Sequence, residues 1–237
     1  MSEFAEFRAR GRAALLDGRA THDLPMVEGA RRWGAGAVLR PEGDVVERLT
    51  ELAASVPAPG HWVHGGSTLH VTLRSLEPYR ARIPEDDPLR RTYGDALTEA
   101  ATGLPPVQVR LAGLTPHQGG VLVYGHLEDD TLLTLRKRYA HALECRGVRD
   151  LEHGRTRDRW YVSLVHFARP LANPRELVEW CDANTEADFG VAELTTAEVV
   201  QFTHTGTGIR VDPLERARLT LHEAPRETTE RHPGPIP

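Results

Sequence analysis

The sequence has few cysteines, no long apolar run and no apolar N-terminal segment. Its 237 residues include two cysteines, Cys145 and Cys181, too few for a disulfide framework or a four-thiolate zinc site. No run approaches the roughly 18 apolar residues of a membrane span. Residues 1–20 carry charges where a signal peptide would be apolar. We therefore expect a protein of the reducing cytoplasm that does not bind membranes.

The motifs of several enzyme classes are also missing. The chain has no GxSxG nucleophile elbow and no HExxH metal site. GGSTLH (65–70) lacks the terminal Gly-Lys-Ser/Thr of a phosphate-binding P-loop, and GTG (206–208) follows a predicted strand without opening a helix. We expect no bound metal and no cofactor.

Composition is that of an ordinary folded protein. With 40% hydrophobic and 27% charged residues, the chain can bury a full core. The net charge of −5 gives no reason to expect a general nucleic-acid binder, although it leaves small anionic ligands possible. We expect a small-molecule or nucleotide substrate and no stable nucleic-acid complex. The oligomeric state stays open, with a monomer as the expectation.

Strands and helices are predicted to alternate in two similar halves. The first half should contain a strand, a helix, one strand or a hairpin, and a helix, at 33–39, 43–57, 60–76 and 87–103. The second should contain two strands joined by a turn, a helix, a strand, a helix and a long strand, at 105–114, 119–127, 129–147, 158–167, 173–183 and 195–206. Residues 217–224 are a further candidate strand.

These elements suggest three segments. Residues 1–27 form an N-terminal extension with an amphipathic helix over 2–17, and 28–223 form the main domain, with lobes at about 33–104 and 105–204. The tail 224–237 has too few apolar residues to fold and is predicted to be disordered.

Two short segments repeat one pattern. TLHVTL (68–73) and RWYVSL (159–164) each place two polar side chains two residues apart in an apolar run, so both polar side chains leave the same face of a strand. The interval from His70 to Tyr161 equals the interval from Thr72 to Ser163. An internal duplication would produce this, and it favours a bilobal α+β fold. Two pseudo-symmetric antiparallel sheets would face a central groove, with helices on the outside.

The first segment and its place in the element order resemble the 2H phosphoesterase superfamily, which includes the 2′,5′ RNA ligase-like proteins and the cyclic phosphodiesterases. The similarity in element order covers roughly residues 33–222. The HxTL motif of that family matches at His70, Thr72 and Leu73. In the second motif, Ser163 occupies the hydroxyl position, but Tyr161 stands where the family has its second histidine.

The resemblance implies in-line attack on a phosphodiester, in which one histidine removes a proton from the nucleophile and the other protonates the leaving oxygen. The two hydroxyl residues would hold the phosphoryl oxygens. Tyrosine, with an ordinary pKa of about 10, can donate a hydrogen bond or act as an acid but is a poor base at neutral pH. We therefore expect acid–base catalysis by His70 with Tyr161, acting on a 2′,3′-cyclic nucleotide or an RNA end.

Two alternatives stay open because the second histidine is replaced. The chain could be a diverged member of the same fold that catalyses another reaction, such as an isomerisation or cyclisation in a biosynthetic pathway. It could also be a non-catalytic protein that binds a small ligand.

Five further residues are candidates for substrate binding. Arg74 and Arg159 flank the two motifs and suit phosphate recognition if they lie at the mouth of the groove. Trp62 and Tyr124 could form aromatic walls. His204 ends a predicted strand beside glycines that permit a close approach.

His166 lies five residues after Tyr161. Strict alternation therefore places it on the opposite face of the strand, unless a β-bulge intervenes. We expect it to lie outside the groove, partly buried and hydrogen-bonded to backbone.

Overall fold

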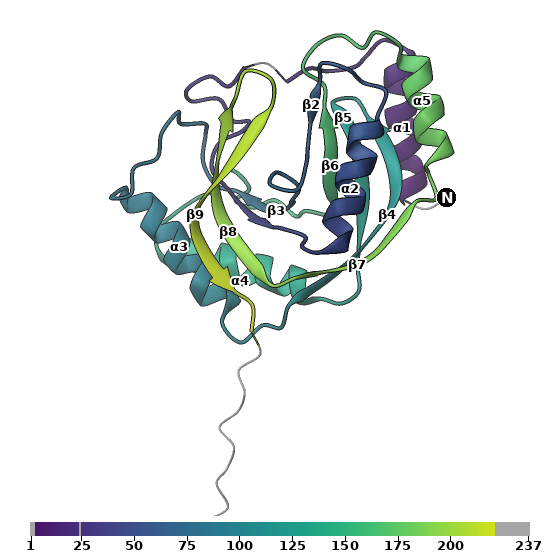
Figure 1. The fold of residues 1–237 in the computed structure, drawn as a ribbon. Helices are drawn as coiled ribbons and strands as arrows, with labels where there is room; N and C mark the ends of the chain where they lie inside the picture. The colour runs from purple at the N-terminus through teal and green to yellow at the C-terminus, as the bar shows by residue number, and fades with distance from the viewer. Residues whose placement is uncertain (1–2, 24, 221–237) are drawn as a thin grey trace, which may run out of the picture.

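Nine strands pair into one curled antiparallel sheet in the computed structural model, which describes residues 3–23 and 25–220 (Figure 1). The strands are β1 Gly36–Leu39, β2 Trp62–Val63, β3 Val71–Ser75, β4 Val107–His117, β5 Gly120–Leu127, β6 Trp160–His166, β7 Asp188–Leu194, β8 Thr196–His204 and β9 Ile209–Arg218. The helices are α1 Glu3–Leu16, α2 Asp44–Ser55, α3 Pro88–Ala101, α4 Thr131–Cys145 and α5 Pro174–Ala183. The predicted α+β class is confirmed.

The sheet consists of two halves that meet at its centre. One half has the order β7-β4-β5-β6 and the other β3-β1-β8-β9, and β2 pairs with β6 beside the junction. Strands β3 and β6 join the halves through the register pair Val71 and Val162. The two expected sheets are thus the halves of one curved sheet. Strand β8, which the sequence places at the end of the second lobe, pairs with β1.

Helices cover the outer face of this sheet. Helices α1 and α5 lie together against β4, whereas α3 and α4 lie together on another side of the molecule, where α3 covers β8 and β9 (Figure 1). One large apolar cluster between helices and sheet contains side chains from both halves, including those of Leu73 and Leu164. The apolar side chains of the two motifs therefore face the core, and the polar ones face the concave side.

Local signals account for the helix boundaries. The side chain of Asp87 caps α3 by accepting hydrogen bonds from the backbone N–H groups of Leu89 and Arg90 at 2.9 and 3.0 Å. Asn173 caps α5 in the same way, because its side-chain oxygen accepts a hydrogen bond from the backbone N–H of Glu176 at 3.2 Å. Among the described residues, no helix has the length and apolar character that a bilayer crossing would need.

Two strands differ from the prediction. Strand β7 lies at one edge of the sheet and was not predicted, because buried and exposed residues only partly alternate along it. Strand β9 begins at Ile209, earlier than the candidate strand at 217–224. The end of that candidate strand and the predicted disordered tail lie outside the described residues.

A matching irregularity occurs in each of the two central strands. Leu73 is the extra residue of a β-bulge where β3 pairs with β1, and Leu164 is the extra residue of a bulge where β6 pairs with β5. Both leucines are fully buried. A bulge reverses the alternation of side chains beyond it. Ser75 and His166 therefore return to the concave face, and the interval between them equals that between Leu73 and Leu164.

Helix α1 docks closely on the end of β4. Gly11 faces Pro116, and a methyl group at position 11 would overlap the Pro116 carbonyl oxygen. Ala14 and Leu15 on the same side of the helix are buried. The absent side chain at position 11 therefore allows the helix to approach the strand backbone.

We expect Gly11→Ala to lower the free energy of unfolding by about 1–3 kcal/mol, because the added methyl group forces the helix away from β4. Helix propensity alone would favour alanine by about 1 kcal/mol, so clash and propensity predict opposite signs. Urea unfolding curves measure the difference, and Ala13→Gly on the exposed side of the helix reports propensity alone. A Gly11→Ala variant at least as stable as the wild type would contradict this packing.

Candidate active site

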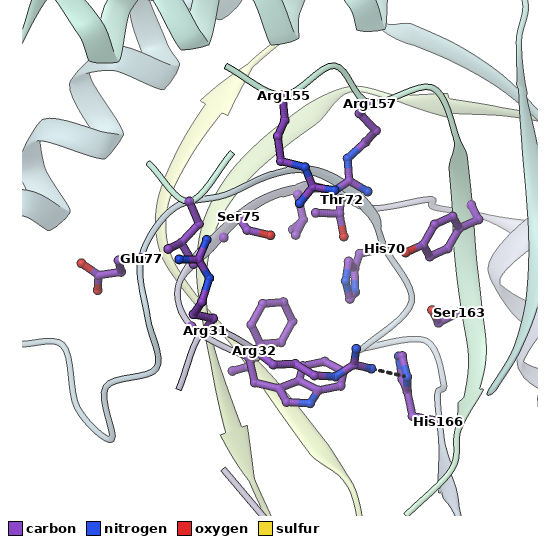
Figure 2. Close-up of a pocket in the computed structure, with 17 residues that line it drawn as sticks. Arg31, Arg32, His70, Thr72, Ser75, Glu77, Arg155, Arg157, Ser163 and His166 are labelled. Carbon is purple, nitrogen blue, oxygen red and sulfur yellow. Dashed lines mark hydrogen bonds between the residues drawn. The ribbon is translucent and has the colours of Figure 1, made fainter. Parts of the chain in front are cut away.

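A pocket of about 390 Å³ lies on the concave face where the two halves of the sheet meet. His70 lies near its middle, with Thr72, Ser163 and His166 around it (Figure 2). The walls come from the segment before β1, from β1, β3, β6 and β8, and from the loop between α4 and β6. The site thus draws on parts of the chain that are far apart in sequence.

The four polar side chains of the repeated motif all line this pocket. Val71 and Val162 are antiparallel partners at the junction, so the residues on either side of one valine face those on either side of the other. A local twofold axis through this valine pair therefore relates His70 to Tyr161 and Thr72 to Ser163. The shared placement predicted from the sequence is confirmed.

The tautomer of His70 is fixed by the backbone. Its Nδ1 lies 2.7 Å from the carbonyl oxygen of Thr68, which can only accept, so Nδ1–H donates and Nε2 carries the free lone pair. Burial lowers the pKa of His70 to about 4, against the opposing effect of the Thr68 carbonyl, and the nearby His166 and Arg40 lower it further. His70 is therefore a neutral imidazole near pH 7 and can accept a proton.

The expectation for His166 is wrong. His166 lines the pocket, because the bulge at Leu164 returns it to the face of Ser163. Its Nδ1 lies 3.2 Å from the Oδ2 of Asp23, and the guanidinium of Arg32 lies 3.5 Å from the same nitrogen. The prediction failed because strict alternation of side chains assumes that the strand pairs without a bulge.

A third histidine connects the other two. The ring of His64 lies 5.0 Å from that of His166 and 6.3 Å from that of His70, measured between centroids. Burial holds the pKa of His64 well below its ordinary value, and His166 and His70 lower it further. Within the described part of the chain, no group of three or more His, Cys, Asp or Glu side chains is arranged to hold a metal ion.

Arginine side chains form a basic rim around the pocket. Arg155 and Arg157 extend into it from the loop before β6, and Arg31 and Arg32 approach from the segment before β1 (Figure 2). Arg157 is bound to Glu152 at 2.5 Å, and Arg32 is bound to Asp23. Among the residues that the structure describes, Arg31 and Arg155 form no ion pair with an acidic side chain, so both remain available to an anionic ligand.

One wall of the pocket is aromatic. Trp33 and Phe202 lie 5.5 Å apart between ring centroids, and the ring of His70 lies 5.5 Å from that of Phe202. Trp33 has a φ of 64° and, among the described residues, is the sole non-glycine with positive φ. Such a conformation is strained for a bulky residue, and strained positions cluster at functional sites.

Arg74 does not take the place predicted for it. The bulge at Leu73 turns Arg74 to the outer side of the sheet, where it is 5% exposed and forms a bidentate pair with Asp150. The neighbouring Arg136 binds Glu152 at 2.6 Å. These pairs support the loop that carries the basic rim, and Arg74 lies beneath that loop without lining the pocket.

The other four substrate-binding candidates also lie outside the pocket lining. Trp62 is buried behind the aromatic wall against Trp33, and the ring of His204 lies 5.0 Å from that of Trp62. Tyr124 packs on Phe4 of α1.

Arg159 lines an adjoining cavity of about 400 Å³, with its guanidinium over Phe7. That cavity shares Arg32, Arg155, Arg157 and Tyr161 with the main pocket.

Most of the pocket's remaining wall residues were not predicted from the sequence. These residues are Asp23 beside His166 and the lining residues Arg31, Arg32, Trp33, Ser75, Arg155, Arg157 and Phe202. Ser75 had a local signal, because it precedes His166 by the same interval that separates His70 from Tyr161. The others are brought in by loops and by β8, whose positions depend on tertiary contacts.

Several solved structures share this fold. The chain resembles a crystal structure of a phosphoesterase (TM-score 0.52, 14% identity), TT0787 of Thermus thermophilus (0.56, 18%) and E. coli LigT complexed with 3′-AMP (0.52, 15%). The alignments cover 79%, 78% and 79% of this chain and 98%, 97% and 98% of those chains. No protein-family model and no curated sequence matches this chain significantly. The fold expected from the resemblance to 2H phosphoesterases is confirmed.

The buried histidines predict a loss of stability in mild acid. Burial lowers the pKa of His64 and of His117, that of His117 to about 3. The unfolded chain takes up protons at these groups below about pH 6.5, but the folded chain does not. Their contribution is therefore complete above about pH 6.5 and decreases as the pH falls, by up to about 1.4 kcal/mol per pH unit for each proton.

Urea unfolding at pH 7.5, 6.5, 5.5 and 5.0 measures this slope, and His117→Gln should make it shallower whatever its effect at pH 7.5. A free energy of unfolding that stays constant down to pH 5 would contradict the assignment of neutral buried histidines.

The placement of Arg74 predicts a role in stability. Arg74→Ala should lower the free energy of unfolding by about 3–5 kcal/mol, because the buried Asp150 carboxylate loses its partner. Arg12→Ala is a matched control, since its pair with Asp182 is exposed and should contribute less than about 1 kcal/mol. Equal effects of the two changes on thermal unfolding would show that Arg74 is not held as described.

Proposed function

We propose that this pocket hydrolyses a phosphodiester such as a 2′,3′-cyclic nucleotide or an RNA end. The observation that carries the proposal is the arrangement of His70 between two hydroxyl residues. His70 has its Nε2 lone pair free, and Thr72 and Ser163 are mates about the junction of the sheet. A proton acceptor beside two hydrogen-bond donors suits attack on a tetrahedral phosphorus.

The residues present would divide the reaction among them. His70 removes a proton from a water molecule as its oxygen forms a bond to phosphorus, and the bond from phosphorus to one ribose oxygen breaks. Thr72 and Ser163 donate hydrogen bonds to the phosphoryl oxygens, which gain charge in the transition state. The ribose oxygen takes up a proton as it leaves, and His70 returns its proton to solvent. The hydroxyl of Tyr161 donates a hydrogen bond to a phosphoryl or leaving oxygen. The product is a phosphomonoester.

The pocket walls support a nucleotide as the substrate. The guanidinium groups of Arg31 and Arg155 can pair with phosphate oxygens in a bidentate manner. Trp33 and Phe202 offer flat apolar surfaces on which a nucleobase can stack. E. coli LigT, which shares the fold, was solved with 3′-AMP, a ligand that combines a phosphate and a base.

Turnover of 2′,3′-cyclic nucleotides and of an RNA oligonucleotide with a cyclic phosphate end tests this function. His70→Ala should reduce kcat on the order of 10²-fold or more, as expected for loss of a positioned acid or base. Tyr161→Phe should lose rate because it deletes only the hydroxyl, whereas Tyr161→His should preserve or raise the rate. His126→Ala, a change at an exposed histidine outside the pocket, is the control and should leave turnover unchanged.

The alternative functions give different results in the same assays. A wild type that binds 3′-AMP without turning over any of these substrates would favour a ligand-binding protein. If Tyr161→His then gained activity, the fold would have been redirected to another reaction.

A further inference from the structure

Asp23 and His166 form a hydrogen-bonded pair at the pocket that the roles assigned above do not use. Nδ1 of His166 lies 3.2 Å from Oδ2 of Asp23, and the two side chains are only 10% and 6% exposed. A carboxylate can only accept, so Nδ1–H donates to Asp23, and the guanidinium of Arg32, 3.5 Å from the same nitrogen, then donates to Asp23 and not to the ring. Nε2 is left for a ligand in the pocket. A carboxylate that orients an imidazole in this way is a recurrent acid–base device.

Asp23 is held firmly in this position. Its backbone N–H donates to the carbonyl oxygen of Phe167 at 2.7 Å, and Arg32 donates to its Oδ2 at 2.6 Å. Two residues earlier, the N–H of Thr21 donates to the carbonyl oxygen of Gln118 at 2.7 Å. The segment after α1 is thereby fixed along the ends of β5 and β6, so the N-terminal extension supplies a partner to a pocket histidine.

The surroundings of the two pocket histidines differ. His70 donates to a neutral carbonyl, which gives little stabilisation to an imidazolium. Burial lowers the pKa of His166, and Arg32 lowers it further, but the Asp23 carboxylate favours the protonated form and offsets part of this effect. The titratable and charged groups that face or influence His166 are Asp23, Arg32, His64, His70 and His117. When two groups in one site have such different environments, the environments assign the acid and the base.

We propose that His166, positioned by Asp23, is the second proton-transfer residue of this pocket and protonates the leaving oxygen. This is the role that the family pattern gives to a histidine at position 161. The inference rests on the proposed phosphodiesterase activity and names the group that completes it.

Each turnover then uses one base and one acid. His70 accepts a proton from water as the new oxygen–phosphorus bond forms. Nε2–H of His166 gives its proton to the ribose oxygen as the bond from that oxygen to phosphorus breaks. The anionic phosphate favours the protonated form of His166 on binding. Tyr161 keeps its proton and donates a hydrogen bond to a phosphoryl oxygen, and solvent returns both histidines to their starting states.

The test compares wild type, His166→Gln and Asp23→Asn with 2′,3′-cyclic AMP from pH 5 to 9, with melting curves measured in parallel. His166→Gln should reduce kcat on the order of 10²-fold. Asp23→Asn should reduce kcat more than it changes KM, and the fall of kcat at high pH should begin at lower pH, because the imidazolium loses its carboxylate. Asp23→Glu, which keeps the carboxylate, should restore the position of that fall.

A relocated histidine provides the sharpest comparison. Tyr161→His in the His166→Gln background should recover at least about tenfold in kcat, because it returns an imidazole to the family position. His61→Gln is the matched control, since His61 is as buried as His166 and bonds the backbone outside the pocket. It should lower the melting temperature without changing kcat.

The outcomes separate this inference from the proposed function. If the wild type is active and His166→Gln retains kcat within about threefold, the role of His166 is overturned and the phosphodiesterase activity stands. The same holds if the double variant is no more active than His166→Gln. An unshifted pH profile in Asp23→Asn overturns the positioning role of Asp23. A wild type that turns over none of the substrates overturns the proposed function, and the inference with it. Should His166→Gln fail to fold, His166→Asn replaces it in every comparison.

Discussion

The register between β3 and β6 is the constraint on which the site depends. These strands join the halves of the sheet through Val71 and Val162, and side chains alternate on either side of that pair. Both valines lie in the core, so the neighbouring polar side chains must face the concave side. A slip of one residue would expose the valines and bury both motifs, which makes the register strongly specified. The polar quartet of the pocket is thus positioned by burial of its apolar neighbours.

The paired bulges extend this arrangement along both strands. Leu73 and Leu164 are each the extra residue, and each adds a fully buried side chain to the core. Beyond the bulges, Ser75 enters the pocket from one half and His166 from the other. Three pocket positions in one half therefore correspond to three in the other. These are His70, Thr72 and Ser75 in the first half, and Tyr161, Ser163 and His166 in the second. The third position in the second half places the imidazole of His166 in a pocket where Tyr161 is the counterpart of His70.

Buried ion pairs on the other side of the sheet connect core and rim. Arg136 donates to the carbonyl oxygen of Leu73, at the bulge, and also binds Glu152. Glu152 in turn binds Arg157, and these two arginines lower the pKa of Glu152 to about 2 although its burial acts in the opposite direction. Removing one member would leave a buried charge without compensation. These buried ion pairs thus hold in place the loop that brings positive charge to the pocket.

Features that depend on local periodicity could be read from the sequence alone. Alternation within TLHVTL and RWYVSL was enough to place His70 with Thr72, and Tyr161 with Ser163, on one face. Other parts of the site arise only in the folded chain. His166 depends on a bulge that appears only when β6 pairs with β5, and Asp23 reaches it across the fold from the segment after α1. Local sequence fixes the direction of a side chain within a regular strand, but bulges and partners from distant segments arise from strand pairing and packing, which no short stretch of sequence encodes.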